Sequence, residues 1–141
     1  MLDLLVQNGT IIDGTGSFRG SVGVRDSRIV ARFAEGEELP AARRSIVADE
    51  CLVLPGMVDP HVHLYGDGFA AYSRLAAIGG VTTSIAMIRG EPEEKLDEVT
   101  SRHQSEGEAG SLLDLSFHGV LYDRPETLGQ IAEMAAKGFQ S

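Results

Sequence analysis

Two histidines with one residue between them, His61 and His63, are the side chains in this sequence best suited to chemistry. In a β-strand, residues two apart point to the same face, so both imidazoles can reach one metal ion at about 2.0–2.1 Å. In a helix they would point about 200° apart. Asp59 lies two residues earlier, and the same alternation places its carboxylate on the histidine face. The spacing therefore predicts a metal site with a carboxylate nearby.

The same pair has a simpler explanation, because two histidines at this spacing also occur in half-buried strands that bind no metal. The neighbouring residues favour the metal. The pair ends an apolar segment, residues 57–63, that follows Pro55-Gly56. Barrel enzymes place their active sites at the carboxyl ends of such strands. We therefore assign His61 and His63 as metal ligands, and assign no residue to catalysis or to another cofactor.

Residues 1–54 have the pattern of a small antiparallel β unit, which we expect to be a β-sandwich-like domain. The turn-forming pairs Asn8-Gly9 and Asp26-Ser27 separate apolar or alternating runs and predict two hairpins. The expected strands lie at residues 2–7, 10–13, 21–25, 28–33 and 44–48.

From residue 55 to residue 141 the predicted elements alternate between strand and helix. Strands are expected at 57–63, 81–87 and 112–120, and helices at 69–78, 92–108 and 125–137, the last capped by Gly138. Three strand–helix units in succession predict a parallel α/β sheet with its helices outside the strands. A closed (β/α)8 barrel takes about 250 residues, so this segment supplies about three of its eight units.

Composition and charge exclude several kinds of partner. The 141 residues carry 21 acidic and 12 basic side chains, and the net charge of −9 has the wrong sign for binding nucleic acid. No apolar run approaches the roughly 18 residues of a membrane-spanning helix, and the first residues lack the basic stretch of a signal peptide. The single cysteine, Cys51, is expected to be a buried apolar residue and fits a reducing compartment. These features predict a cytoplasmic protein with no nucleic-acid or membrane partner.

The segment PGMVDPHVHL at residues 55–64 resembles the P-G-x-x-D-x-H-x-H signature of the amidohydrolase superfamily. It is most similar to the cyclic amidohydrolases, namely hydantoinases, dihydropyrimidinases, allantoinases and dihydroorotases. Further similarity covers the N-terminal β unit, the run GGVTT at residues 79–83 and the run DLSFH at residues 114–118. The chain corresponds to about the first third of such a protein.

The resemblance implies a truncated TIM-like (β/α)8 metal-dependent hydrolase barrel preceded by the β unit. In the family, the H-x-H pair binds zinc or another divalent metal, and a carbamylated lysine, further histidines and an aspartate on later strands complete the site. Only His61 and His63 match that set; Lys137 ends a predicted helix and does not match the bridging lysine. The full-length protein is expected to hydrolyse C–N bonds of small cyclic amides, and the family resemblance leaves a homo-oligomer open. The isolated chain, with two ligands, is expected to be inactive.

Two alternatives stay open beside this interpretation. The chain could be a non-catalytic, hydantoinase-like assembly subunit, or it could belong to the N-acyl-D-amino-acid deacylase branch, which the run DGTG at residues 13–16 resembles. Dihydroorotate is disfavoured as a substrate, because residues 64–67 lack the arginine that follows H-x-H in dihydroorotases.

Three other residues have competing explanations. Tyr65 is placed either in the substrate cleft or on the surface, and His103 either on the surface of a helix or in its packing. His118 is expected to face the mouth of the barrel, although the family takes no metal ligand from this segment.

Overall fold

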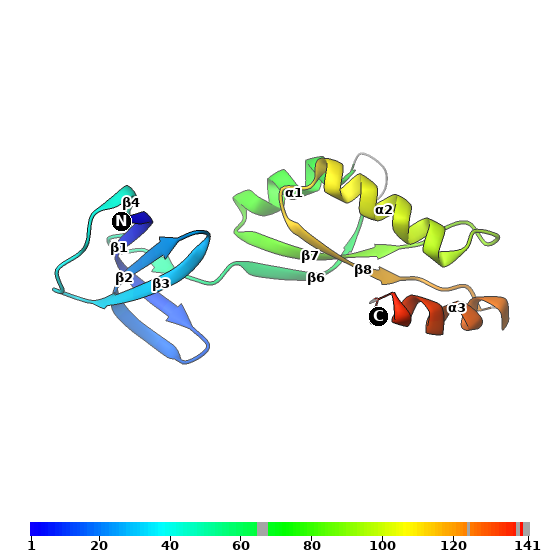
Figure 1. Cartoon of the computed structure of the whole chain (residues 1–141), viewed down its shortest axis with the longest axis horizontal. Coiled ribbons are helices and arrows are strands. Elements are labelled where there is room, and N and C mark those ends of the chain that lie inside the picture. Colours follow the sequence, from blue (N-terminus) through cyan, green and yellow to red (C-terminus); the bar gives the residue numbers. More distant parts are fainter. Residues whose placement is uncertain (65–67, 124, 138, 140–141) are drawn as a thin grey trace. The chain divides into compact units, whose positions relative to one another are not determined.

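The structure, a computed structural model, describes residues 1–64, 68–123, 125–137 and 139. The chain divides into two units, Met1–Pro55 and Gly56–Ser141 (Figure 1). Among the described residues, no helix is long and apolar enough to cross a membrane.

The first unit contains one five-stranded sheet. Its strands are β1 (Leu2–Asp13), β2 (Gly16–Arg25), β3 (Arg28–Ala34), β4 (Ala42–Val47) and β5 (Leu52–Val53). The order is β3-β2-β1-β4, and β5 pairs with β1 as well. The pairs β1–β2 and β2–β3 are antiparallel, whereas β4 and β5 run parallel to β1. The sheet is therefore mixed. Its buried side chains include Leu5 and Ile11 of β1 and Val22 of β2.

The predicted turn at Asn8-Gly9 is wrong, because β1 continues through both residues. The pairing of β1 with β2 shifts between Val6 and Gly9, and Asn8 has a φ of 60°. The backbone N–H of Asn8 donates to Ser21 Oγ at 3.1 Å. Asn-Gly supplies the left-handed backbone that a β-bulge needs as much as a turn does. The second predicted hairpin is confirmed, with Asp26 and Ser27 at φ 51° and 58° in its two-residue turn.

Cys51 is exposed, so the prediction that it is a buried apolar residue is also wrong. Its backbone explains the position. The Cys51 N–H donates to the Ala48 carbonyl at 3.0 Å, and the Cys51 carbonyl accepts from the Thr10 N–H at 3.0 Å. The backbone is fixed by these bonds while the side chain points into solvent.

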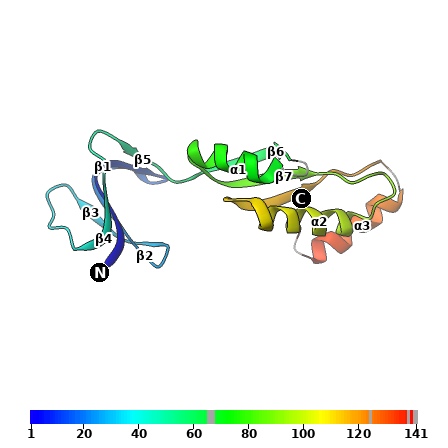
Figure 2. The same cartoon turned by 90° about the horizontal axis from the view of Figure 1, so that it is seen from above.

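In its described residues, the second unit contains a parallel sheet and three helices (Figure 2). The strands are β6 (Met57–His63), β7 (Val81–Ile88) and β8 (Asp114–Gly119), in the order β6-β7-β8. The helices are α1 (Gly68–Ile78), α2 (Leu96–Gly110) and α3 (Pro125–Ala136). Strand and helix alternate as predicted, which confirms the mixed α/β class.

Helix α2 begins at Leu96 rather than at the predicted residue 92. The residues before it form a turn closed by their own hydrogen bonds. The Glu94 N–H donates to the Glu91 carbonyl at 3.1 Å, and the Glu94 carboxylate accepts from the Glu91 N–H at 2.7 Å. Pro92 therefore starts this turn and does not start the helix.

The core of the second unit lies between the sheet and its helices. Ala86 and Phe117 are paired neighbours on β7 and β8, and both are buried together with Phe69 of α1. Val62 of β6 pairs with Ala86 and packs against the same cluster. Because paired residues of parallel strands share a face, this row defines the helix-covered face of the sheet. Residues that alternate with the row lie on the opposite, open face.

Candidate functional site

His61 and His63 lie at the carboxyl end of β6 with their side chains directed toward each other. Their Nε2 atoms are 3.1 Å apart. The ring centroids are 5.1 Å apart, with the ring planes inclined at 62°. Both residues are exposed, and His63 pairs with Met87, whose position on β7 is on the open face. The two imidazoles thus share one face of a strand, as their spacing predicts.

The separation of the two Nε2 atoms fits a shared metal ion. Nitrogen ligands lie about 2.0–2.1 Å from zinc, and two of them at a tetrahedral angle are roughly 3.3 Å apart. The observed 3.1 Å is close to that value. The same distance also suits an N–H···N hydrogen bond between two neutral rings, in which one Nε2 carries the proton. A metal ion bound to both rings would need the Nε2 lone pair of each, so the ring that donates would carry its proton on Nδ1 instead.

Asp59 does not lie on the histidine face, which corrects the prediction from strand alternation. It pairs with Ser84, while Val62 pairs with Ala86, so three steps along β6 match two along β7. This shift is a β-bulge, and it leaves Asp59 on the helix-covered face with Ser84. Pro60 inside the strand is the sequence signal for such a bulge, because proline donates no hydrogen bond to the sheet.

The Asp59 carboxylate is hydrogen-bonded on both oxygens. The Tyr72 hydroxyl of α1 donates to Oδ2 at 2.5 Å, and the backbone N–H of His61 donates to Oδ1 at 3.1 Å. These bonds, the one from Tyr72 first, lower the pKa of Asp59. Burial and then the bond to Asp59 raise the pKa of Tyr72. The carboxylate is therefore ionised and the phenol protonated at neutral pH. The sequence reasoning missed Tyr72, since nothing local to it points to β6.

His118 occupies the same level of the sheet as His63. Both pair with Met87, which lies between them on β7. His118 is half-buried at the carboxyl end of β8. It is not a third ligand of the pair: among the residues that the structure describes, no group of three or more His, Cys, Asp or Glu side chains could hold a metal ion.

His103 packs in the interior of the second unit, and Lys137 lies on its surface. His103 is buried on α2, where Nδ1 donates to the Val99 carbonyl at 2.8 Å and the ring meets Phe69 edge-on at 6.4 Å. Packing, not the surface, is therefore the right alternative. Lys137 forms ion pairs with Asp97 at 3.2 Å and Glu133 at 3.3 Å. The expected roles of Tyr65 and Gly138 lie outside the described residues.

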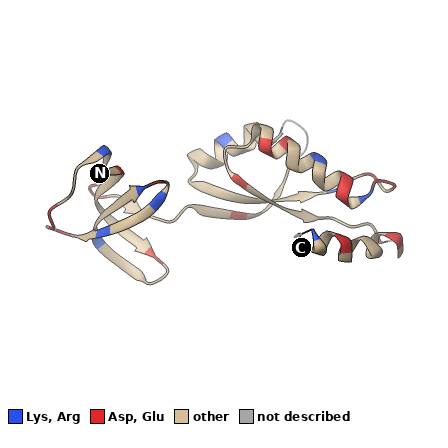
Figure 3. Cartoon of the chain, in the orientation of Figure 1, with Lys and Arg blue, Asp and Glu red and all other residues tan. Residues whose placement is uncertain are grey.

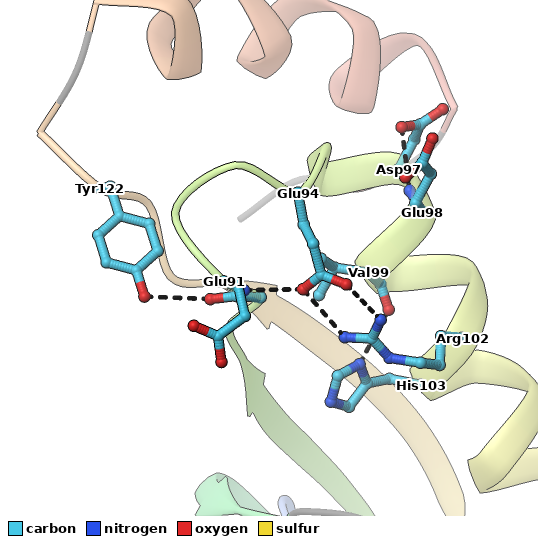
Figure 4. Close-up of polar contacts among 9 residues, drawn as sticks. Glu91, Glu94, Asp97, Glu98, Val99, Arg102, His103 and Tyr122 are labelled. Atoms are coloured by element: carbon cyan, nitrogen blue, oxygen red, sulfur yellow. Dashed lines mark hydrogen bonds and ion pairs between the residues drawn. The ribbon is translucent and has the colours of Figure 1, made fainter.

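The loops that follow β7 and β8 are joined at the same end of the sheet (Figure 4). The Tyr122 hydroxyl donates to the Gly90 carbonyl at 3.1 Å, and the guanidinium of Arg89 lies 5.9 Å from the centroid of the Tyr122 ring. Glu94 forms an ion pair with Arg102 of α2 at 2.6 Å. Acidic residues gather in this loop and in the first turn of α2 (Figure 3), namely Glu91, Glu93, Glu94, Asp97 and Glu98.

No protein-family model matches the chain. Among curated proteins it is 33% identical to an allantoinase from Bacillus licheniformis over 129 residues, covering 84% of this chain and 28% of the relative. It is 32% identical to an L-hydantoinase from Paenarthrobacter aurescens over 154 residues, covering 100% of this chain and 32% of the relative.

Solved structures of hydantoinases also match this chain. A D-hydantoinase structure superposes with a TM-score of 0.86 at 26% identity, covering 98% of this chain and 32% of that one. The L-hydantoinase (dihydropyrimidinase) from Arthrobacter aurescens gives 0.82 at 27% identity, covering 97% and 31%. The chain thus spans about a third of the length of the proteins that it matches.

Proposed function

Because this chain is homologous to the N-terminal portion of the cyclic amidohydrolases, we propose that it provides the first two metal ligands of an enzyme that hydrolyses a C–N bond of a cyclic amide. The observation that carries the proposal is the 3.1 Å separation of the His61 and His63 Nε2 atoms at the carboxyl end of a parallel strand. Substrates of the hydantoin or dihydropyrimidine type fit the names of the relatives.

In this proposal the parallel sheet is the beginning of a (β/α)8 barrel. Residues 55–141 contribute about three strand–helix units, and residues 1–54 form the separate β domain that precedes them. The order β6-β7-β8 and the parallel pairing support this interpretation, because a barrel of this class grows by adding each strand beside the last. The open face of the sheet would then line the barrel interior.

Three histidines at this end of the sheet have separate roles in the proposed enzyme. A divalent ion such as zinc, when bound, supplies activation of water and polarisation of the scissile carbonyl. His61 and His63 hold it through the Nε2 lone pair, so each ring must be the neutral imidazole with its one proton on Nδ1. His118 lies at the level of His63 on β8, and this register supports a role for it on the substrate side of the site in the proposed enzyme.

The structure supports a different explanation for the run that resembles the deacylase branch. Residues 13–16 form the tight connection between β1 and β2. The Asp13 carboxylate accepts hydrogen bonds from the Thr15 backbone at 2.8 Å and from its hydroxyl, and it forms an ion pair with Arg32 at 2.6 Å. This run is therefore accounted for by turn formation, and it does not favour the deacylase over the cyclic amidohydrolase.

A chimera tests the proposed function. In it, this chain replaces the homologous first third of the L-hydantoinase from Paenarthrobacter aurescens, and hydantoin hydrolysis is measured with and without zinc. We expect metal-dependent turnover that is abolished by His61→Ala or His63→Ala and retained with Cys51→Ser, while the 141-residue chain alone shows none. Turnover that survives both histidine substitutions would contradict the proposal, and so would a folded chimera that binds no zinc.

A further inference from the structure

We propose that Asp59 and Tyr72 are positioning residues that fix which face of β6 presents His61 and His63. The inference rests on the proposed function, because it concerns the same two metal ligands. Their hydrogen bonds lead to the backbone of the strand, through the N–H of His61.

The β-bulge decides the direction of the histidines. Asp59 lies on the helix-covered face, opposite Ser84. In a regular strand, alternation from Asp59 would place His61 and His63 on that face too, among the buried residues of the core. The extra residue between Asp59 and Val62 reverses the alternation, so Val62 enters the core and the histidines reach the open face. A shift of one residue in a strand exchanges its two faces.

One hydrogen bond within β6 and one from α1 hold the bulge in place. The extra residue interrupts the pairing with β7, and the Asp59 carboxylate accepts the N–H of His61. The other carboxylate oxygen accepts from the Tyr72 hydroxyl. Tyr72 in turn is fixed by α1, packs against the core cluster and hydrogen-bonds Ser84 Oγ at 3.0 Å. The chain of contacts therefore runs from a buried anchor on β7 through the helix to the backbone of a ligand.

The experiment measures the zinc affinity of the 141-residue chain by isothermal titration. A Cys51→Ser background removes the exposed thiol, which could bind zinc itself. The variants are Tyr72→Phe, Asp59→Ala and Asp59→Asn. The matched control is Ser73→Ala, which deletes another hydroxyl of α1, one that donates to the Ala70 carbonyl and accepts from the Leu112 N–H, both outside β6.

We expect Tyr72→Phe and Asp59→Ala to weaken zinc binding by about tenfold or more, the usual effect of losing a group that orients a ligand. Asp59→Asn keeps an oxygen for the His61 N–H and should restore most of the affinity lost in Asp59→Ala. Ser73→Ala should bind zinc like the parent. Amide hydrogen exchange in Asp59→Ala should accelerate at His61 and stay unchanged in β7 and β8, whereas a general loss of stability would accelerate exchange across the whole sheet; Ser73→Ala should leave exchange at His61 unchanged.

Unchanged zinc affinity in folded Tyr72→Phe and Asp59→Ala would overturn this inference. If Tyr72→Phe does not fold, as judged by circular dichroism, the comparison of Asp59→Ala with Asp59→Asn decides. Parallel titrations of His61→Ala and His63→Ala separate the two proposals. If these variants bind zinc as tightly as the parent, the proposed metal site itself fails; if they lose binding while the Asp59 and Tyr72 variants keep it, only the positioning role fails.

Discussion

At the scale of single residues, Glu94 has the most strongly lowered carboxyl pKa among the described residues. The hydrogen bond from Arg102, followed by the one from the Glu91 N–H, lowers its pKa from the ordinary 4.5 to about 2. A lowered pKa means that the ionised contact stabilises the folded state above about pH 4.5, and that this stabilisation is lost as the pH falls toward 2. We therefore expect Glu94→Gln to melt at a lower temperature than the parent at pH 7.

Thermal melts between pH 2 and pH 7 check this prediction. The difference between Glu94→Gln and the parent should shrink below pH 4.5 and vanish near pH 2. Glu38→Gln, an equal change of charge in the exposed loop before β4, is the control and should melt like the parent at every pH. A constant difference across the whole range would show that the ionisation of Glu94 is not the cause.

The residue scale also shows what spacing can and cannot predict. The shared face of His61 and His63 follows from two-residue alternation and is independent of contacts elsewhere. The side of Asp59 depends on a bulge held by Tyr72, which is 13 residues away in the sequence. His103 has the sequence context of either a surface or a packed residue, and only the position of Phe69 on another helix makes it buried.

At the scale of elements, Gly20 marks a close approach between β2 and β3. A Cβ atom there would lie 2.1 Å from the Phe33 carbonyl oxygen and 2.9 Å from Cε2 of Phe18. The carbonyl belongs to the backbone of the paired strand and cannot rotate away. Gly20→Ala should therefore destabilise the first unit by about 1–3 kcal/mol, the usual cost of overpacking.

Urea denaturation measures this cost, and Gly14→Ala is the matched control. A Cβ atom at Gly14 would have no neighbour within 4 Å. Its substitution should change the free energy of unfolding by less than about 0.5 kcal/mol, as for most surface positions. Equal stability of the two alanine variants would contradict the register of β2 against β3.

Elements were predicted best where the pattern is long and uniform. The apolar run of β7 and the periodic helices α1 and α3 appear close to the expected bounds. Local turn signals were less reliable, because Asn8-Gly9 serves a bulge and Pro92 starts a turn before α2. The parallel pairing of β4 with β1 had no local signal, since it is set by contacts across about forty residues of sequence.

At the scale of the whole molecule, the parallel sheet exposes backbone at both edges. In the described part of the chain, β6 and β8 each pair only with β7. Apolar side chains are exposed nearby, including Val58 at 58% and Leu112 at 68%. The net charge of −9 opposes association, but physiological salt screens it over about 8 Å. The isolated chain should therefore self-associate.

Sedimentation velocity over a range of concentrations tests for this association. Ser116→Lys places a charge on exposed edge strand β8 and should shift the chain toward monomer, because edge lysines block strand pairing. Ser105→Lys makes the same change on the exposed surface of α2 and should leave the association unchanged. A single monomeric species at every concentration would show that the edge strands β6 and β8 do not mediate self-association.

Anomalous diffraction at the zinc edge, on crystals of this chain grown with zinc, tests the central claim most directly. We expect one anomalous peak within about 2.0–2.1 Å of both the His61 and the His63 Nε2 atoms. Crystals of His63→Ala should lose that peak. Zinc bound elsewhere, with the two imidazoles still 3.1 Å apart and no peak between them, would contradict the account.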